Sequence, residues 1–146
     1  MAVAAAEGDP TEDLATALAT KAVWHLRHEQ FAAAIECADR SVEVAQAVPV
    51  PVIESLARHR RSQAYYALGR VADAAAEAGA AARAAERPGG SPAYAVAAEL
   101  FQAEVLLSGL NPARAPKSRA RDVWMRRPCW SPSSSRQATN RTTRGS

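Results

Sequence analysis

Three histidines, two cysteines and a short row of carboxylates are the side chains of this chain that best suit metal binding or catalysis. His25 and His28 are three residues apart, which places two imidazole rings on one face of a helix within reach of a common metal ion. No thiolate or carboxylate at a matching spacing completes a ligand set, because Cys37 belongs to a different predicted helix. We therefore expect no metal site and expect these histidines to lie on the surface.

Sequence motifs for phosphate binding and nucleophilic catalysis are absent. The glycine-rich stretch RPGGSP at 87–92 has neither the lysine nor the preceding strand that a phosphate-binding loop requires. Glu36, Asp39 and Glu43 recur at intervals of three and four residues, which puts them together on the solvated face of a helix. A catalytic pair of carboxylates needs two different environments, and a solvated face supplies only one. We expect no enzymatic activity and no cofactor.

Charge divides the chain after residue 111. Residues 1–111 hold nine Lys and Arg against fourteen Asp and Glu, a net charge of −5, whereas residues 112–146 hold nine basic residues against one Asp, a net charge of +8. The basic segment interleaves aromatic and cationic side chains that are able to stack on bases and neutralise phosphates, namely Trp124, Arg126, Arg127 and Trp130. Its Ser, Thr, Pro and Gly content more simply predicts a disordered tail over 109–146, so a nucleic-acid partner is expected only through this tail.

Length and composition favour one helical domain followed by that tail. The chain has 146 residues, of which 36 are Ala and only eight are aromatic, a mixture that suits helices packed through small side chains and not a sandwich or barrel. No apolar run approaches the roughly 18 residues that span a bilayer, and the first residues lack the basic and apolar regions of a secretory signal. We expect a cytoplasmic protein without a membrane segment.

Apolar residues at intervals of three and four, together with helix-ending residues, predict five helices. Thr11 begins the first, which runs over about 12–28, and a second follows from Phe31 to the prolines at 49 and 51. The third occupies about 52–68 and ends at Gly69. The last two are expected at about 71–86 and from 92 to Gly109.

An internal repeat of 40 residues relates these helices. Glu29, Gly69 and Gly109 are 40 residues apart and are expected to occupy the same turn. Alanines recur at the same interval on the helices that follow the first two turns, in the pairs 34 and 74, 38 and 78, and 45 and 85. Such a repeat predicts helix pairs that stack on copies of themselves, with the small residues between closely spaced backbones.

These residues resemble the tetratricopeptide repeat family. The segments ALGRVADAAAEAGAAARAA (67–85) and HEQFAAAIECADRSVEVA (28–45) carry the matching small and apolar positions, although the period of 40 exceeds the usual 34. The resemblance implies an all-α solenoid of antiparallel helix pairs over residues 12–108. It also implies a non-enzymatic module that binds a peptide or partner helix in a groove, lined here by Thr16, Val23, Arg27, His59, Gln63, Tyr66, Val96 and Glu99.

A second interpretation is that the chain is a fragment. Long repeats of this kind are similar to those of bacterial transcriptional regulators and signal-responsive ATPases, whose arrays hold many more copies. The expected apolar stripe of a sixth helix fails after residue 112, which suggests a change of coding frame near residue 110. Helix five then lacks a partner helix, and its apolar side chains predict self-association, chiefly through Phe101 and Leu106.

Overall fold

A computed structural model describes residues 9–111 and 113, and within them the chain is entirely helical. The all-α prediction is confirmed, and each predicted helix is present with ends that differ by about one residue. The five helices are α1 (Glu12–Arg27), α2 (Phe31–Ala47), α3 (Pro51–Ala67), α4 (Val71–Glu86) and α5 (Pro92–Leu110).

The helix ends form where the sequence predicts them. The side-chain oxygen of Thr11 accepts a hydrogen bond from the backbone N–H of Leu14 at 3.2 Å and caps α1. Proline stands in the first turn of α3 and of α5, where its missing N–H leaves no hydrogen bond unmade. Gly69 lies in the turn between α3 and α4 with a φ of +78°, in the left-handed region that favours glycine.

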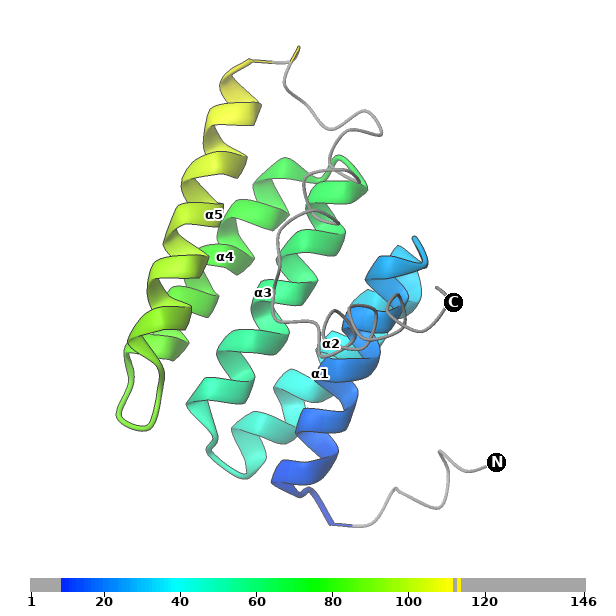
Figure 1. The fold of residues 1–146 in the computed structure, drawn as a ribbon, viewed down its shortest axis with the longest axis vertical. Coiled ribbons are helices and arrows are strands. Elements are labelled where there is room, and N and C mark those ends of the chain that lie inside the picture. Colours follow the sequence, from blue (N-terminus) through cyan, green and yellow to red (C-terminus); the bar gives the residue numbers. More distant parts are fainter. Residues whose placement is uncertain (1–8, 112, 114–146) are drawn as a thin grey trace, which may run out of the picture.

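The helices pack as successive neighbours in one row. Figure 1 shows α3 between the α1–α2 hairpin and the α4–α5 pair. Each helix contacts the next one along the chain, and α3 also contacts both α1 and α5. The odd-numbered helices therefore share one side of the molecule.

Small residues allow the paired helices to approach closely. The hydroxyl of Ser41 on α2 donates to the carbonyl of Ala15 on α1, and the hydroxyl of Ser62 on α3 donates to the carbonyl of Ala74 on α4, both at 2.7 Å. The burial pattern of α4 repeats that of α2 at the predicted interval of 40 residues. The buried pairs are Ala34 and Ala74, Ala38 and Ala78, Val42 and Ala82, and Ala45 and Ala85.

The turn predicted at Gly109 is wrong, because α5 continues through Leu110. A Cβ atom on Gly109 would lie 3.2 Å from Cγ1 of Val71, the first residue of α4. The missing side chain therefore lets the end of α5 approach the start of α4. This glycine serves helix packing, whereas its counterpart at 69 serves a turn.

The two hairpin turns make a matched pair for mutation. Glu29 adopts a φ of +60° at the position equivalent to Gly69, and no atom lies within 4 Å of a Cβ built on Gly69. We expect Glu29→Gly to raise the free energy of unfolding by about 0.5–1 kcal/mol and Gly69→Ala to lower it by about 1–2 kcal/mol, because left-handed backbone is costly for residues with a Cβ. Urea unfolding followed by circular dichroism measures both. If both substitutions changed the free energy of unfolding in the same direction, the two turns would not be equivalent.

Among the described residues, α5 is the helix that is long and apolar enough to cross a membrane by length and composition. Two observations indicate that α5 packs in the helical stack and does not cross a membrane. One face of α5 packs in the core, and its carboxylates Glu99 and Glu104 are exposed. Each carboxylate would cost roughly 2.5–3.5 kcal/mol at the centre of a bilayer.

Candidate functional site

Exposed apolar side chains concentrate on α5. Eight large apolar side chains are exposed in the described part of the chain, and six of them belong to this one helix. Leu100 is 65% exposed and Leu107 is 56% exposed, so neither side chain belongs to the hydrophobic core. The six residues are Tyr94, Val96, Leu100, Leu106, Leu107 and Leu110.

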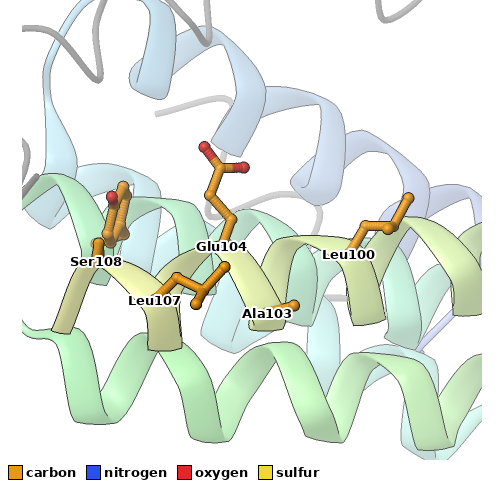
Figure 2. Close-up of a pocket in the computed structure, with 6 residues that line it drawn as sticks. Leu100, Ala103, Glu104, Leu107 and Ser108 are labelled. Atoms are coloured by element: carbon orange, nitrogen blue, oxygen red, sulfur yellow. The ribbon is translucent and has the colours of Figure 1, made fainter. Parts of the chain in front are cut away.

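Two shallow depressions lie along α5. The first, of about 490 Å³, is bounded by Tyr66 of α3 and by Leu100, Ala103, Glu104, Leu107 and Ser108 of α5. Figure 2 shows Leu100, Ala103, Glu104, Leu107 and Ser108 side by side along α5, with the carboxylate of Glu104 among the apolar side chains that line this depression. The second depression, of about 410 Å³, lies at the other end of α5 and includes Val96 and Glu99. Both are open and mostly apolar, which suits a side chain of a partner better than a small molecule.

Phe101 is not part of the exposed surface, so the prediction that it drives association is corrected. Its ring is 4% exposed and meets the rings of Tyr66 and His59 edge to face, at centroid distances of 5.8 Å and 5.3 Å. The residues one helical turn away on either side, Ala98 and Val105, are also buried. This spacing turns Phe101 toward α3 and α4, whereas Leu106 is 52% exposed as expected.

The structure divides the eight predicted groove residues among three helices. On α1, Thr16 and Arg27 are exposed and Val23 is partly buried, whereas on α5 Val96 and Glu99 are exposed and share the second depression. On α3 the predicted residues form one row beside Phe101, in which His59 is partly buried and Gln63 and Tyr66 are buried. Tyr66 reaches the first depression, His59 packs against Phe101 of α5, and Gln63 contacts His59 and Arg60 on its own helix. Leu100 and Leu107 also line the first depression, although neither was predicted from the sequence. They are seven residues apart, which places both on one face of a helix, and this spacing could have indicated them.

His59 does not lie on the surface as predicted, because its ring is partly buried against Phe101 of α5. Nε2 of Gln63 lies 3.1 Å from Nε2 of His59, and Oε1 of Gln63 accepts a hydrogen bond from Arg60 at 3.1 Å. Burial first, and then the positive charge of Arg60, lower the pKa of His59 to about 3. The imidazole therefore carries no charge at neutral pH and does not act as a proton donor there.

The buried histidine makes stability depend on pH. Its pKa of about 3 in the folded chain is below the ordinary value of 6.5, so the unfolded chain binds the extra proton between these values. Stability is complete above pH 6.5 and falls as the pH drops toward 3. We expect the His59 contribution to the free energy of unfolding to fall by about 1.4 kcal/mol between pH 7.5 and 5.5. Urea unfolding at both values measures the change, and His59→Gln removes it if the assignment is correct.

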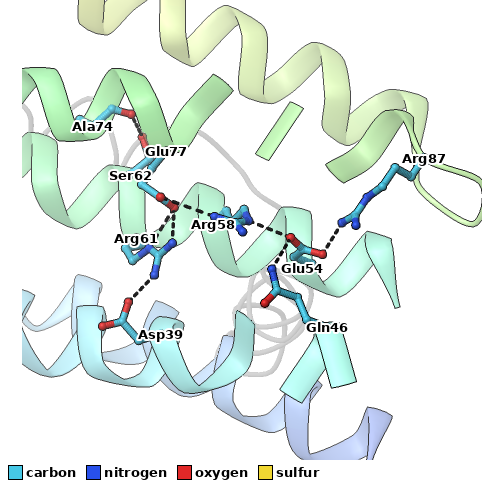
Figure 3. A network of polar contacts seen from close by, with 9 residues as sticks. All are labelled: Asp39, Gln46, Glu54, Arg58, Arg61, Ser62, Ala74, Glu77 and Arg87. Carbon is cyan, nitrogen blue, oxygen red and sulfur yellow. Dashed lines mark hydrogen bonds and ion pairs between the residues drawn. The ribbon is translucent and has the colours of Figure 1, made fainter. Parts of the chain in front are cut away.

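A network of ion pairs on another face joins α2, α3 and α4 (Figure 3). Arg61 of α3 pairs with Asp39 of α2 at 2.5 Å and with Glu77 of α4 at 2.6 Å. Arg58 bridges Glu54 at 2.9 Å and Glu77 at 3.5 Å. Glu36 and Glu43 are exposed as predicted, and the Asp39 side chain is 43% exposed while it pairs with Arg61. Residues 54, 58 and 61 are spaced by four and three, so the sequence places their charged side chains on one face of α3. Which residues of α2 and α4 pair with them depends on how the helices pack.

Charge compensation holds the buried parts of this network ionised. Burial by itself would raise the pKa of Glu54, but hydrogen bonds from Arg87, Arg58 and Gln46 outweigh it and lower that pKa. Burial would likewise lower the pKa of Arg61, and its hydrogen bonds to two carboxylates raise it. These ionic contacts join α2, α3 and α4, so this face stabilises the helix stack.

The other two histidines, His25 and His28, lie at the C-terminal end of α1. Nδ1 of His28 lies 2.8 Å from the carbonyl of Trp24, and Nδ1 of His25 lies 2.6 Å from the side chain of Gln30. His59 lies on α3, and no cluster of three metal-ligand side chains occurs among the described residues. Cys37 is a free thiol whose pKa is raised chiefly by burial, which disfavours the thiolate. The aromatic and basic residues predicted at 124–130 lie outside the described residues.

No protein-family model, curated protein or solved structure matches the chain. What the chain does is therefore inferred from its own side chains. The exposed apolar face of α5, with its two depressions, is the surface in the described residues that best suits recognition.

Proposed function

We propose that the chain is a non-enzymatic protein-interaction module that presents α5 and the adjoining surface of α3 to a helix or peptide of a partner. The observation that carries this proposal is the concentration on α5 of six of the eight exposed large apolar side chains. A contiguous exposed apolar surface is costly in water and marks an interaction site when a fold retains it.

The arrangement of helices supports the same function. Odd-numbered helices share one side of the molecule because α3 contacts both α1 and α5. Stacked helix hairpins of this kind, and the resemblance to tetratricopeptide repeats, favour a groove that accepts an extended peptide or a helix. Val96 and Glu99 supply one apolar and one polar contact on the exposed part of α5. We place this activity in the cytoplasm.

Site-specific photo-crosslinking tests the proposal in cells that express the protein. A benzophenone amino acid at Leu100, which is 65% exposed, is expected to form a covalent adduct with one recurrent partner. The matched control places the same amino acid at Ala76, an exposed position on α4 away from the proposed surface.

The adduct at 100 should disappear when Leu107, the neighbouring wall of the first depression, is changed to Ser. Equal adducts from 76 and 100 would contradict the assignment of the surface. No adduct from 100, together with catalytic turnover by the purified chain, would contradict the function itself.

A further inference from the structure

A heptad pattern runs along the exposed side of α5. Six apolar residues follow one another at intervals of three, four, three, four and three, and every one of them is exposed. This alternation of three and four is the pattern of a coiled-coil seam, in which side chains of one helix insert between those of another. We call this set the outer seam; it comprises Ala93, Val96, Leu100, Ala103, Leu107 and Leu110.

The outer seam is distinct from the face of α5 that holds the fold together. The core face consists of residues 95, 98, 101, 105 and 108, all buried against the neighbouring helices. α5 is therefore apolar on two faces, whereas a helix at the end of a stack needs only one. Both depressions open onto the outer seam, since Leu100 and Leu107 line the first and Val96 lines the second.

The charges beside the seam are of one sign. Glu99 and Glu104 are the only charged residues of α5, and both are exposed. In the heptad they occupy the two flanking positions, one on each side of the seam, where coiled coils place the charges that select a partner. Glu99 lines the second depression and Glu104 the first, so each carboxylate stands beside an apolar recess.

We propose that the outer seam binds an amphipathic helix of another protein whose own apolar heptad seam is flanked by Lys and Arg. This inference rests on the proposed function and specifies the chemistry of the partner. The apolar seam supplies the contact area, and the two carboxylates favour cationic flanking residues.

A second copy of this chain is a poorer occupant for an electrostatic reason. Two parallel α5 helices would place Glu99 of one against Glu104 of the other, because flanking positions five residues apart face each other across a coiled coil. Two antiparallel helices would again oppose carboxylates. Like charges at these positions act against self-pairing and leave a basic partner as the complementary choice. The seam extends over residues 93–110, about 26 Å of helix, which fits a partner segment of about 18–21 residues.

Two synthetic peptides test this proposal with the full-length chain. Both are fluorescein-labelled helices of about 21 residues with Leu at the seam positions, and they differ only in carrying Lys or Glu at the flanking positions. We expect the Lys peptide to bind at least about tenfold more tightly in anisotropy titrations, since each flanking contact changes from attraction to repulsion. Raising the salt concentration should reduce the difference.

Two double variants separate the seam from its charges. Glu99→Lys with Glu104→Lys should reverse the preference toward the Glu peptide. Leu100→Ser with Leu107→Ser should abolish binding of both peptides while the far-ultraviolet circular dichroism stays unchanged, because these side chains are exposed.

Each other outcome overturns the proposal in a recognisable way. Equal binding of both peptides refutes the charge selection but preserves the interaction function. Binding of neither peptide by a chain that sedimentation shows to be dimeric assigns the seam to a second copy. An intramolecular crosslink from position 100 into residues 112–146 assigns the seam to the chain's own C-terminal segment. Binding of neither peptide by a monomer that also yields no crosslinked partner refutes the proposed function as well.

Discussion

Replacing Ala74 by arginine is expected to unfold the α3–α4 hairpin. Ala74 is fully buried, and its carbonyl accepts the hydrogen bond from Ser62 that ties the two helices together. Overpacking at such a site costs roughly 1–3 kcal/mol, and a buried charge without a partner adds several more. A domain of this size has a total stability of only about 5–15 kcal/mol. We expect a large loss of helical circular dichroism at 222 nm and of cooperative thermal unfolding.

Ala76 provides the matched control on the same helix. It is exposed, so Ala76→Arg changes charge and volume by the same amount without entering the interface. We expect its melting temperature to stay within a few degrees of the parent protein. Unchanged helicity and melting in Ala74→Arg would contradict the packing of α3 against α4.

The second large effect is expected at Phe101. The Phe101→Ala protein should lose about 3–5 kcal/mol of unfolding free energy, because the ring fills the space between α5 and the aromatic residues of α3. Urea unfolding, followed by circular dichroism, measures this loss. The adjacent substitution Leu100→Ala removes a side chain that is 65% exposed and should change stability by less than about 0.5 kcal/mol.

The comparison of these neighbouring substitutions separates the two faces of α5. Phe101 is expected to affect folding, whereas Leu100 is expected to affect only recognition. A result in which Leu100→Ala is the more destabilising change would mean that α5 is rotated relative to α4. The outer seam would then belong to the core.

Local signals in the sequence predicted the helices well. Thr11, Pro51, Gly69 and Pro92 each act within one turn of the chain, so their effects are readable without knowledge of the fold. The spacing of alanines likewise predicted the buried faces of α2 and α4, because close packing at an interval of three and four requires small side chains.

Contacts between distant residues escaped prediction. Gly109 was expected in a turn but packs against Val71, and the ion pair of Asp39 with Arg61 was not predicted. Both depend on which helices lie side by side, a choice that the local pattern does not contain. For the same reason Phe101 was grouped with exposed residues of α5, since its inward orientation is fixed by the rings of α3.

The candidate site was predicted only in part. Val96 and Glu99 do lie on an exposed face of α5. Gln63 and Tyr66 are buried instead of lining an open groove, and the ring of Tyr66 packs against Phe101 of α5. Leu100 and Leu107 were missed because an apolar residue in a helix is ordinarily expected to be buried. They are exposed because another face of α5 already packs against the neighbouring helices.

Hydrogen–deuterium exchange of the full-length chain, alone and with the Lys-flanked peptide, tests most directly whether α5 is the recognition surface. We expect peptide-dependent protection of residues 92–110 and of the adjoining end of α3, with exchange in α1 and α2 unchanged. Protection confined to α1 and α2, or no change anywhere at a peptide concentration that saturates binding, would contradict the assignment of recognition to α5.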